Sequence, residues 1–175
     1  MLVVLVGPKG SGKSHIGRIL ERRLGVLFFH VEPLWMAYHA ECAAAGRSPD
    51  VAGGIRRVHP GIRDALERNG TICVETTGAS AELLDDLLSL APPGQTLVVR
   101  LNAPLELCLE RIARRDPTHQ IPLSLEGIRK VYELAMAAPV SADLTLENLA
   151  LGEEEIVSSL AAALARKRAG TAPVP

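Results

Sequence analysis

The stretch LVVLVGPKGSGKS, residues 2–14, decides the fold of this chain. It begins with a short apolar run rich in Val, which is typical of a central parallel strand covered on both faces. Gly7, Gly12, Lys13 and Ser14 then satisfy the pattern G-x-x-x-x-G-K-[ST], and a helical pattern follows. We therefore predict a loop that binds the phosphates of a nucleotide.

The residue types in this loop suit an anion. Gly10 and Gly12 permit positive φ, so successive backbone N–H groups can turn inward around a phosphate. A helix that opens near Lys13 adds unpaired N–H groups, the Lys13 ammonium adds a mobile charge, and the Ser14 hydroxyl is a hard ligand for Mg²⁺. The predicted phosphate-binding residues are Gly7, Gly10, Ser11, Gly12, Lys13 and Ser14.

Composition limits the class of protein. The 175 residues fit one domain, and the net charge of −1 gives no general attraction to nucleic acid or anionic lipid. Cys42, Cys73 and Cys108 are odd in number and far apart, which indicates reduced core thiols. The apolar start is too short for a signal peptide or a membrane span. We expect a cytoplasmic protein with a small-molecule substrate, no nucleic-acid or membrane partner, and a monomeric or weakly dimeric state.

Apolar patterns alternate between strands and helices along the chain. This order predicts an α/β fold with a parallel sheet, whose ligands lie at the carboxyl ends of the strands. One domain is expected over 1–168, with an Arg-rich, proline-bounded lid at about 111–123 and a disordered tail at 169–175. Glycine and proline in residues 45–54 predict a loop or a break between helices. The predicted strands are 2–6, 26–29, 71–74, 96–101 and 142–146.

Polar residues follow the second and third strands, where they would meet the phosphate loop. Glu75 is expected to hold Mg²⁺ through water, or else to cap the next helix or pair with an arginine. Thr76, Thr77 and Gly78 continue a substrate wall. His30 and Glu32 are both candidates to bind the acceptor and take its proton, and Glu32 is preferred. The alternative for Glu32 is a carboxylate that only begins the helix before Pro33.

Arginines supply the expected cationic groups. Arg111, Arg114 and Arg115 lie where a helix enters the lid, from which Arg111 and Arg115 can reach a γ-phosphate, while one of the three pairs with a neighbouring acid. Arg56 and Arg57 either grip an anionic substrate or are exposed helix charges. Trp35 and Tyr38 are interpreted as core or pocket wall rather than as a base-stacking platform.

The chain resembles the shikimate kinase-like group of small P-loop kinases, a branch of the nucleoside monophosphate kinase fold. The resemblance implies a three-layer fold with a five-stranded sheet in the order 2-3-1-4-5, helices on both faces and a small lid. It further implies ATP and Mg²⁺ as cofactors, an adenine wall near Asn148, and a substrate-gripping arginine at Arg56 or Arg57. The matching segments are GPKGSGKSHIGRILERRLGVLFF (7–29), GGIRRVHPGIRDAL (53–66), LNAPLELCLERIARRD (101–116) and ADLTLENLALGEEEIVSSL (142–160).

The chain departs from that group at the acceptor site. Shikimate kinases carry Asp-x-Asp after the second strand, where this chain has His30-Val31-Glu32, and a glycine triplet where it has Glu75-Thr76-Thr77-Gly78. The leading hypothesis is therefore an ATP-dependent kinase for a hydroxyl of a small, anionic metabolite. A nucleoside or nucleotide kinase, and an ATP-binding regulatory module without transfer activity, are the alternatives.

Overall fold

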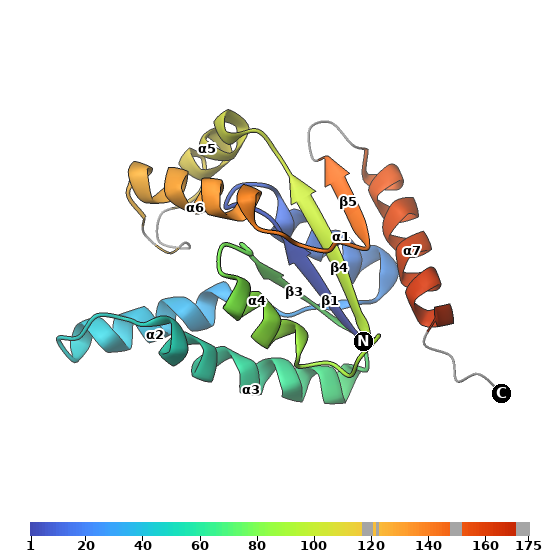
Figure 1. The fold of residues 1–175 in the computed structure, drawn as a ribbon, viewed down its shortest axis with the longest axis horizontal. Helices are drawn as coiled ribbons and strands as arrows, with labels where there is room; N and C mark the ends of the chain where they lie inside the picture. The colour runs from blue at the N-terminus through green and yellow to red at the C-terminus, as the bar shows by residue number, and fades with distance from the viewer. Residues whose placement is uncertain (117–120, 122, 148–151, 171–175) are drawn as a thin grey trace.

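A computed structural model describes residues 1–116, 121, 123–147 and 152–170 of the chain (Figure 1). The strands are β1 (Leu2–Val6), β2 (Leu27–Phe28), β3 (Ile72–Thr76), β4 (Thr96–Asn102) and β5 (Leu144–Glu147). The helices are α1 (Lys13–Leu24), α2 (Glu32–Ala44), α3 (Val51–Asn69), α4 (Ala81–Leu88), α5 (Leu105–Ala113), α6 (Leu125–Ala137) and α7 (Glu153–Gly170). The predicted alternation of strands and helices is thus present.

The five strands form one parallel sheet in the order β2-β3-β1-β4-β5, which confirms the predicted fold class. β1 is central and entirely buried, because it is paired on both edges and covered on both faces. Its side chains alternate between two cores. Val3 and Leu5 pack with α1 and α7, whereas Leu2, Val4 and Val6 pack with α3 and α4.

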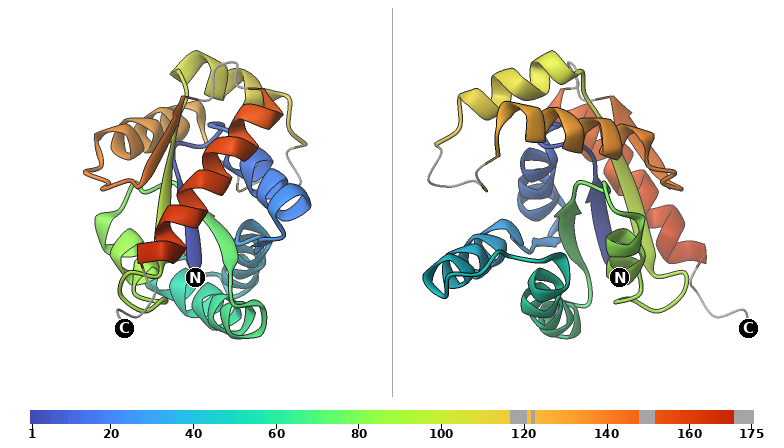
Figure 2. Two further views of the ribbon diagram at one scale, coloured as in Figure 1. Left: turned by 90° about the vertical axis from the view of Figure 1, so that its right-hand side faces the viewer. Right: turned by 60° about the vertical axis from the view of Figure 1, so that its left-hand side comes forward.

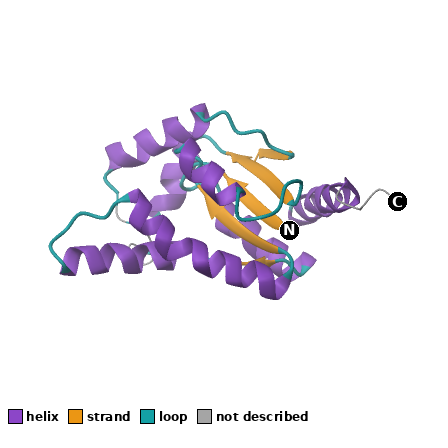
Figure 3. Ribbon diagram, turned by 60° about the horizontal axis from the view of Figure 1, so that its bottom comes forward, coloured by secondary structure: helices purple, strands orange, loops and turns teal. Residues whose placement is uncertain are grey.

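The remaining helices gather at the carboxyl edge of the sheet. α5 and α6 lie at the end toward which the strand arrows point, and α2 projects from the side of the sheet where β2 and β3 lie (Figure 1). Figure 2 shows α2 and α6 on opposite sides of that edge, and Figure 3 shows how helices surround the sheet. The phosphate loop, which follows β1, therefore opens between these helices.

One predicted loop is partly helical. Residues 45–54 were expected to be a loop or break, but α3 already begins at Val51. The Asp50 side chain caps this helix by accepting a hydrogen bond of 2.7 Å from the Gly53 N–H, and the Tyr38 hydroxyl donates to the same carboxylate at 2.9 Å. The glycines that suggested a break are buried in α3: a Cβ added at Gly54 would lie 1.8 Å from the Trp35 ring. Gly53 and Gly54 let α3 approach α2 closely.

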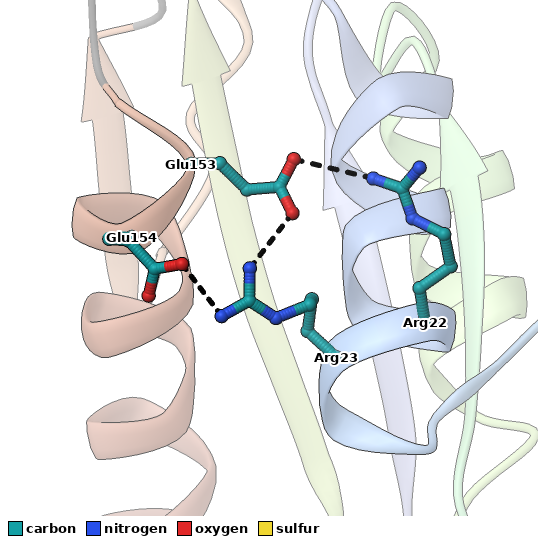
Figure 4. Close-up of polar contacts among 4 residues, drawn as sticks. All are labelled: Arg22, Arg23, Glu153 and Glu154. Carbon is teal, nitrogen blue, oxygen red and sulfur yellow. Dashed lines mark hydrogen bonds and ion pairs between the residues drawn. The ribbon is translucent and has the colours of Figure 1, made fainter.

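An ion-pair cluster joins the carboxyl end of α1 to the start of α7 (Figure 4). Arg22 and Arg23 both contact Glu153, and Arg23 also contacts Glu154 at 2.7 Å. Each charge also complements the dipole of its own helix, since the arginines lie in a last turn and the glutamates in a first turn. The cluster links segments about 130 residues apart in the chain.

Three further expectations concern the chain as a whole. Cys42, Cys73 and Cys108 are free and buried, as predicted. α7 continues to Gly170, so the first two residues of the predicted tail are helical. None of the helices that the structure describes has the length and apolar character needed to cross a membrane.

Candidate functional site

The phosphate loop connects β1 to α1 through two left-handed glycines. Gly10 has φ 87° and Gly12 has φ 98°, a region that side chains other than hydrogen rarely occupy. Gly12 is also the N-cap of α1, so the first N–H groups of that helix face the loop. The Lys13 ammonium donates to the carbonyl oxygens of Gly7 at 2.8 Å and Pro8 at 2.9 Å. It therefore folds back across the loop.

Burial shapes the charge of this lysine. Removal from water lowers the pKa of Lys13, and the nearby Glu75 carboxylate opposes that shift. A phosphate brought into the loop would supply the negative charge that a desolvated ammonium lacks. The electrostatics therefore favour an anionic ligand at this position.

Ser14 and Glu75 are the two predicted metal ligands, and the structure brings them together. The Ser14 hydroxyl donates to both oxygens of the Glu75 carboxylate at 3.1 Å. A hydroxyl and a carboxylate are hard oxygen donors that fit Mg²⁺, which binds proteins through few ligands and completes its shell with water and phosphate. Among the residues that the structure describes, no group of three or more His, Cys, Asp or Glu could hold a metal ion.

A cavity of about 350 Å³ opens from the phosphate loop. Residues of α2, of the start of α4 and of α6 line it, together with Arg115, Ile121 and Leu123. Its lining residues are Lys9, Gly10, Gly12, Lys13, Ser14, Val31, Glu32, Trp35, His39, Glu75, Thr76, Thr77, Ala79, Leu83, Arg115, Ile121, Leu123 and Val131. The loop, the predicted Mg²⁺ ligands and the preferred proton acceptor thus share one cavity.

Of the two candidate proton acceptors, only Glu32 lines this cavity. Glu32 is the first residue of α2, where the helix dipole favours a carboxylate, and its Oε1 accepts a hydrogen bond from the Ile121 N–H at 3.3 Å. His30 is exposed and its ring lies 4.2 Å from that of Phe28, measured between centroids. The two residues after β2 therefore face different surroundings.

The three arginines at the end of α5 also differ in their surroundings. Arg115 lines the cavity, and the Arg111 guanidinium donates to the Gly10 carbonyl oxygen at 3.4 Å. Arg114 forms an ion pair with Glu110 instead, as expected for one of the three. Arg111 and Arg115 consequently approach the phosphate loop from the end of α5.

Arg56 and Arg57 do not line the main cavity. They line a second one, of about 270 Å³, with Tyr38, Glu41, Arg47 and Gly53. Arg57 also forms an ion pair with Glu41 on α2. The two predicted substrate arginines therefore line a different cavity from the phosphate loop.

The other predicted site residues differ in whether they line the main cavity. Thr76 and Thr77 line the cavity, whereas Gly78 is buried against Val6 and does not. Ser11 is buried within the loop, and Asn148 lies outside the described residues.

Sequence reasoning missed Lys9, whose ammonium donates to the Ile121 carbonyl oxygen at 2.8 Å. Burial lowers the pKa of Lys9. The sequence marks this residue only by its position among the variable residues of the phosphate-loop motif. It also missed the apolar cavity wall, because Leu83 and Val131 belong to helical stripes that read as core.

The chain matches the family described as AAA domain over residues 2–133. Among curated proteins, a shikimate kinase of Psychrobacter arcticus is 32% identical over 64% of this chain, and the match spans 59% of that protein's length. A cytidylate kinase of Azorhizobium caulinodans is 28% identical over 94% of this chain and 97% of its own length.

Solved structures show the same fold. Shikimate kinase from Aquifex aeolicus superimposes with a TM-score of 0.59 at 22% identity, covering 97% of this chain and 99% of that one. A gluconokinase from Sinorhizobium meliloti has a TM-score of 0.61 at 23% identity, covering 94% of this chain and 91% of that one.

The family match covers most of the chain and includes the whole phosphate loop. The chain therefore belongs to the AAA domain family, as a small P-loop protein of the kinase type.

Proposed function

We propose that the protein is an ATP- and Mg²⁺-dependent phosphotransferase whose acceptor is a hydroxyl of a small molecule. The observation that carries this proposal is a single cavity that has the phosphate loop at one end and the Glu32 carboxylate in its wall. Phosphoryl transfer needs positioned phosphates, cations for the developing charge and a group that accepts the hydroxyl proton. Residues of each kind line this cavity or contact its loop.

Each residue has a role in that reaction. Lys13 would leave the carbonyls of Gly7 and Pro8 for the phosphates, and Ser14 with Glu75 would hold Mg²⁺, which neutralises phosphate charge. Arg111 and Arg115 would stabilise the charge that develops on the transferred group. The acceptor oxygen bonds to the γ-phosphorus as the bond from that phosphorus to the β–γ bridging oxygen breaks, and the acceptor proton passes to Glu32.

The sequence prediction of an anionic acceptor depends on Arg56 and Arg57. Since both line the second cavity, anionic charge is not part of this proposal. A nucleoside or nucleotide acceptor is the second candidate, favoured by the near full-length similarity to a cytidylate kinase and by the Trp35 ring in the cavity. A regulatory module that binds ATP without transfer would need the same loop, so only turnover separates it from a kinase.

The test measures acceptor-dependent release of ADP from Mg-ATP with a panel of sugar acids, cyclitols, sugar alcohols and nucleosides. Glu32→Gln should lower kcat by about 10²–10⁴-fold, because it removes the proton acceptor. His30→Gln is the matched control at the end of the same strand and should retain turnover. Tight ATP binding without acceptor-dependent ADP across the panel would favour the regulatory module, and loss of turnover in His30→Gln alone would reassign the base.

Lys13→Ala tests the phosphate loop itself. It should abolish nucleotide binding, measured as the loss of thermal stabilisation by Mg-ADP. Unchanged stabilisation by Mg-ADP in this variant would contradict the assignment of the loop.

A further inference from the structure

The backbone of Ile121 is held by two residues of the candidate site. Its carbonyl oxygen accepts a hydrogen bond of 2.8 Å from the Lys9 ammonium, and its N–H donates to Glu32 Oε1 at 3.3 Å. Lys9 belongs to the phosphate loop, Glu32 is the first residue of α2, and all three residues line the main cavity. Ile121 therefore connects the phosphate loop to the proposed proton acceptor.

The two oxygens of the Glu32 carboxylate have different surroundings. Oε1 accepts the Ile121 N–H, whereas no residue in the described part of the chain donates a hydrogen bond to Oε2. A carboxylate that is held through one oxygen keeps acceptor sites on the other. A general base works only within hydrogen-bond reach of the proton that it takes, so a contact that fixes the direction of this carboxylate matters for the rate.

Lys9 is suited to hold Ile121. The side chain is partly buried, and the loss of water lowers the pKa of Lys9, an effect that the Glu32 carboxylate opposes and Arg115 reinforces. A partly desolvated ammonium needs an acceptor, and the Ile121 carbonyl oxygen provides one at a distance typical of charge-assisted hydrogen bonds. The contact therefore satisfies Lys9 and at the same time places the Ile121 backbone beside Glu32.

The other lysine of the phosphate loop has different partners. Lys13 donates to the carbonyl oxygens of Gly7 and Pro8, which belong to the loop itself. Lys9 instead reaches Ile121, which lies 112 positions further along the chain. The loop thus offers Lys13 to the phosphates and directs Lys9 to another segment.

We infer that Lys9 is a positioning residue, which through Ile121 holds the Glu32 carboxylate in the orientation that takes the proton of the acceptor hydroxyl. This inference rests on the proposed function, because Glu32 needs a fixed direction only if it acts as the base. Two other roles predict different results: Lys9 could bind the phosphates of ATP directly, or the Ile121 N–H could block Glu32.

The first experiment does not depend on turnover. Hydrogen exchange of the Ile121 amide would be followed by NMR in the nucleotide-free protein. Lys9→Met should speed this exchange by about fivefold, the factor expected for the loss of one typical hydrogen bond, and Lys9→Arg should keep it slow. Lys130→Met changes an exposed lysine of α6 that does not line the cavity, and it should leave the exchange rate unchanged.

The second experiment measures turnover with an acceptor from the panel. Lys9→Met should lower kcat by about tenfold and leave the KM for ATP within about twofold, and Lys9→Arg should recover most of the loss. In the Glu32→Gln background the same change should have no further effect, because there is no base left to position. Ile121→Pro removes the N–H and retains the carbonyl, so it should lower kcat more than Ile121→Ala does.

The contrary results are specific. A raised KM for ATP at unchanged kcat would assign Lys9 to the phosphates, a higher kcat in Lys9→Met or Ile121→Pro would show that Ile121 blocks Glu32, and additive losses in the double variant would show independent roles. Each of these overturns the inference, as does unchanged Ile121 exchange in Lys9→Met, while the kinase proposal stands. Absence of wild-type turnover with every acceptor, together with the expected exchange rates, would refute the kinase proposal and leave the Lys9–Ile121 contact established.

Discussion

Gly54→Ala is the sharpest perturbation of the α2–α3 contact. The added Cβ would lie 1.8 Å from Cζ3 of Trp35, whereas ordinary contact begins at 3.4 Å, so the ring or the helix must move by about 1.6 Å. Overpacking of this kind costs about 1–3 kcal/mol, and the better helix propensity of Ala returns about 1 kcal/mol. The net loss of up to about 2 kcal/mol corresponds to a fall in Tm of up to about 8 °C in a domain of this size.

The same substitution should disturb the cavity, because Trp35 forms part of its wall. Thermal unfolding followed by circular dichroism gives Tm, and Trp35 emission reports the position of the ring. Gly61→Ala is the matched control in α3: its Cβ would lie 2.9 Å from the tip of the Phe29 ring, so a shift of about 0.5 Å suffices. A Gly54→Ala protein at least as stable as Gly61→Ala, with unchanged Trp35 emission, would refute the packing argument.

Three further variants test separate features. Glu75→Gln should raise the Mg²⁺ concentration needed for half-maximal turnover, because the carboxylate attracts the cation. It should also tighten the binding of Mg²⁺-free ATP, because the carboxylate repels the triphosphate. Titrations with and without EDTA measure the two effects. Arg23→Ala should lower the urea midpoint at low salt, and the difference from wild type should vanish near about 1 M NaCl, where ion pairs are screened. Burial in the folded protein lowers the pKa of His59 from its ordinary 6.5. The unfolded chain therefore binds this proton more readily than the folded protein does. The stability of the wild-type protein should fall as the pH drops through about 6.5 towards the lower pKa of the folded state. The His59→Gln variant should show a flatter profile of urea midpoint against pH over that range.

The parts of this fold that sequence could predict depend on local rules. Residues 2–14 carry the strand, the turn and the helix start of the phosphate loop in one contiguous stretch, so no tertiary information is needed to recognise it. The buried strands are likewise visible as apolar runs between turn residues. The strand order came from the resemblance instead, because it depends on contacts between distant segments.

The parts that local rules missed depend on tertiary packing. Gly53 and Gly54 read as helix breakers because propensity cannot show that Tyr38 and Trp35 occupy the space where their Cβ atoms would be. Asp50 was a usable signal, since an Asp before a helical stripe is a common N-cap. The placement of Arg56 and Arg57 was beyond sequence reasoning, because the register of one helix against another decides which cavity a side chain lines.

The packing of α7 has a consequence for how the chain is made. Ile156, Leu160, Ala163 and Leu164 of this helix complete the core that also contains Val3 and Leu5 of β1 and the buried face of α1. A ribosome synthesises α7 after all five strands, so in a nascent chain halted before residue 153 that face of the sheet lacks α7 and keeps only the cover of α1. Such a chain already contains every residue of the phosphate loop, yet it should behave as a chaperone substrate and not as a nucleotide-binding protein. Competence to bind would then arise late in synthesis, when α7 docks beside α1.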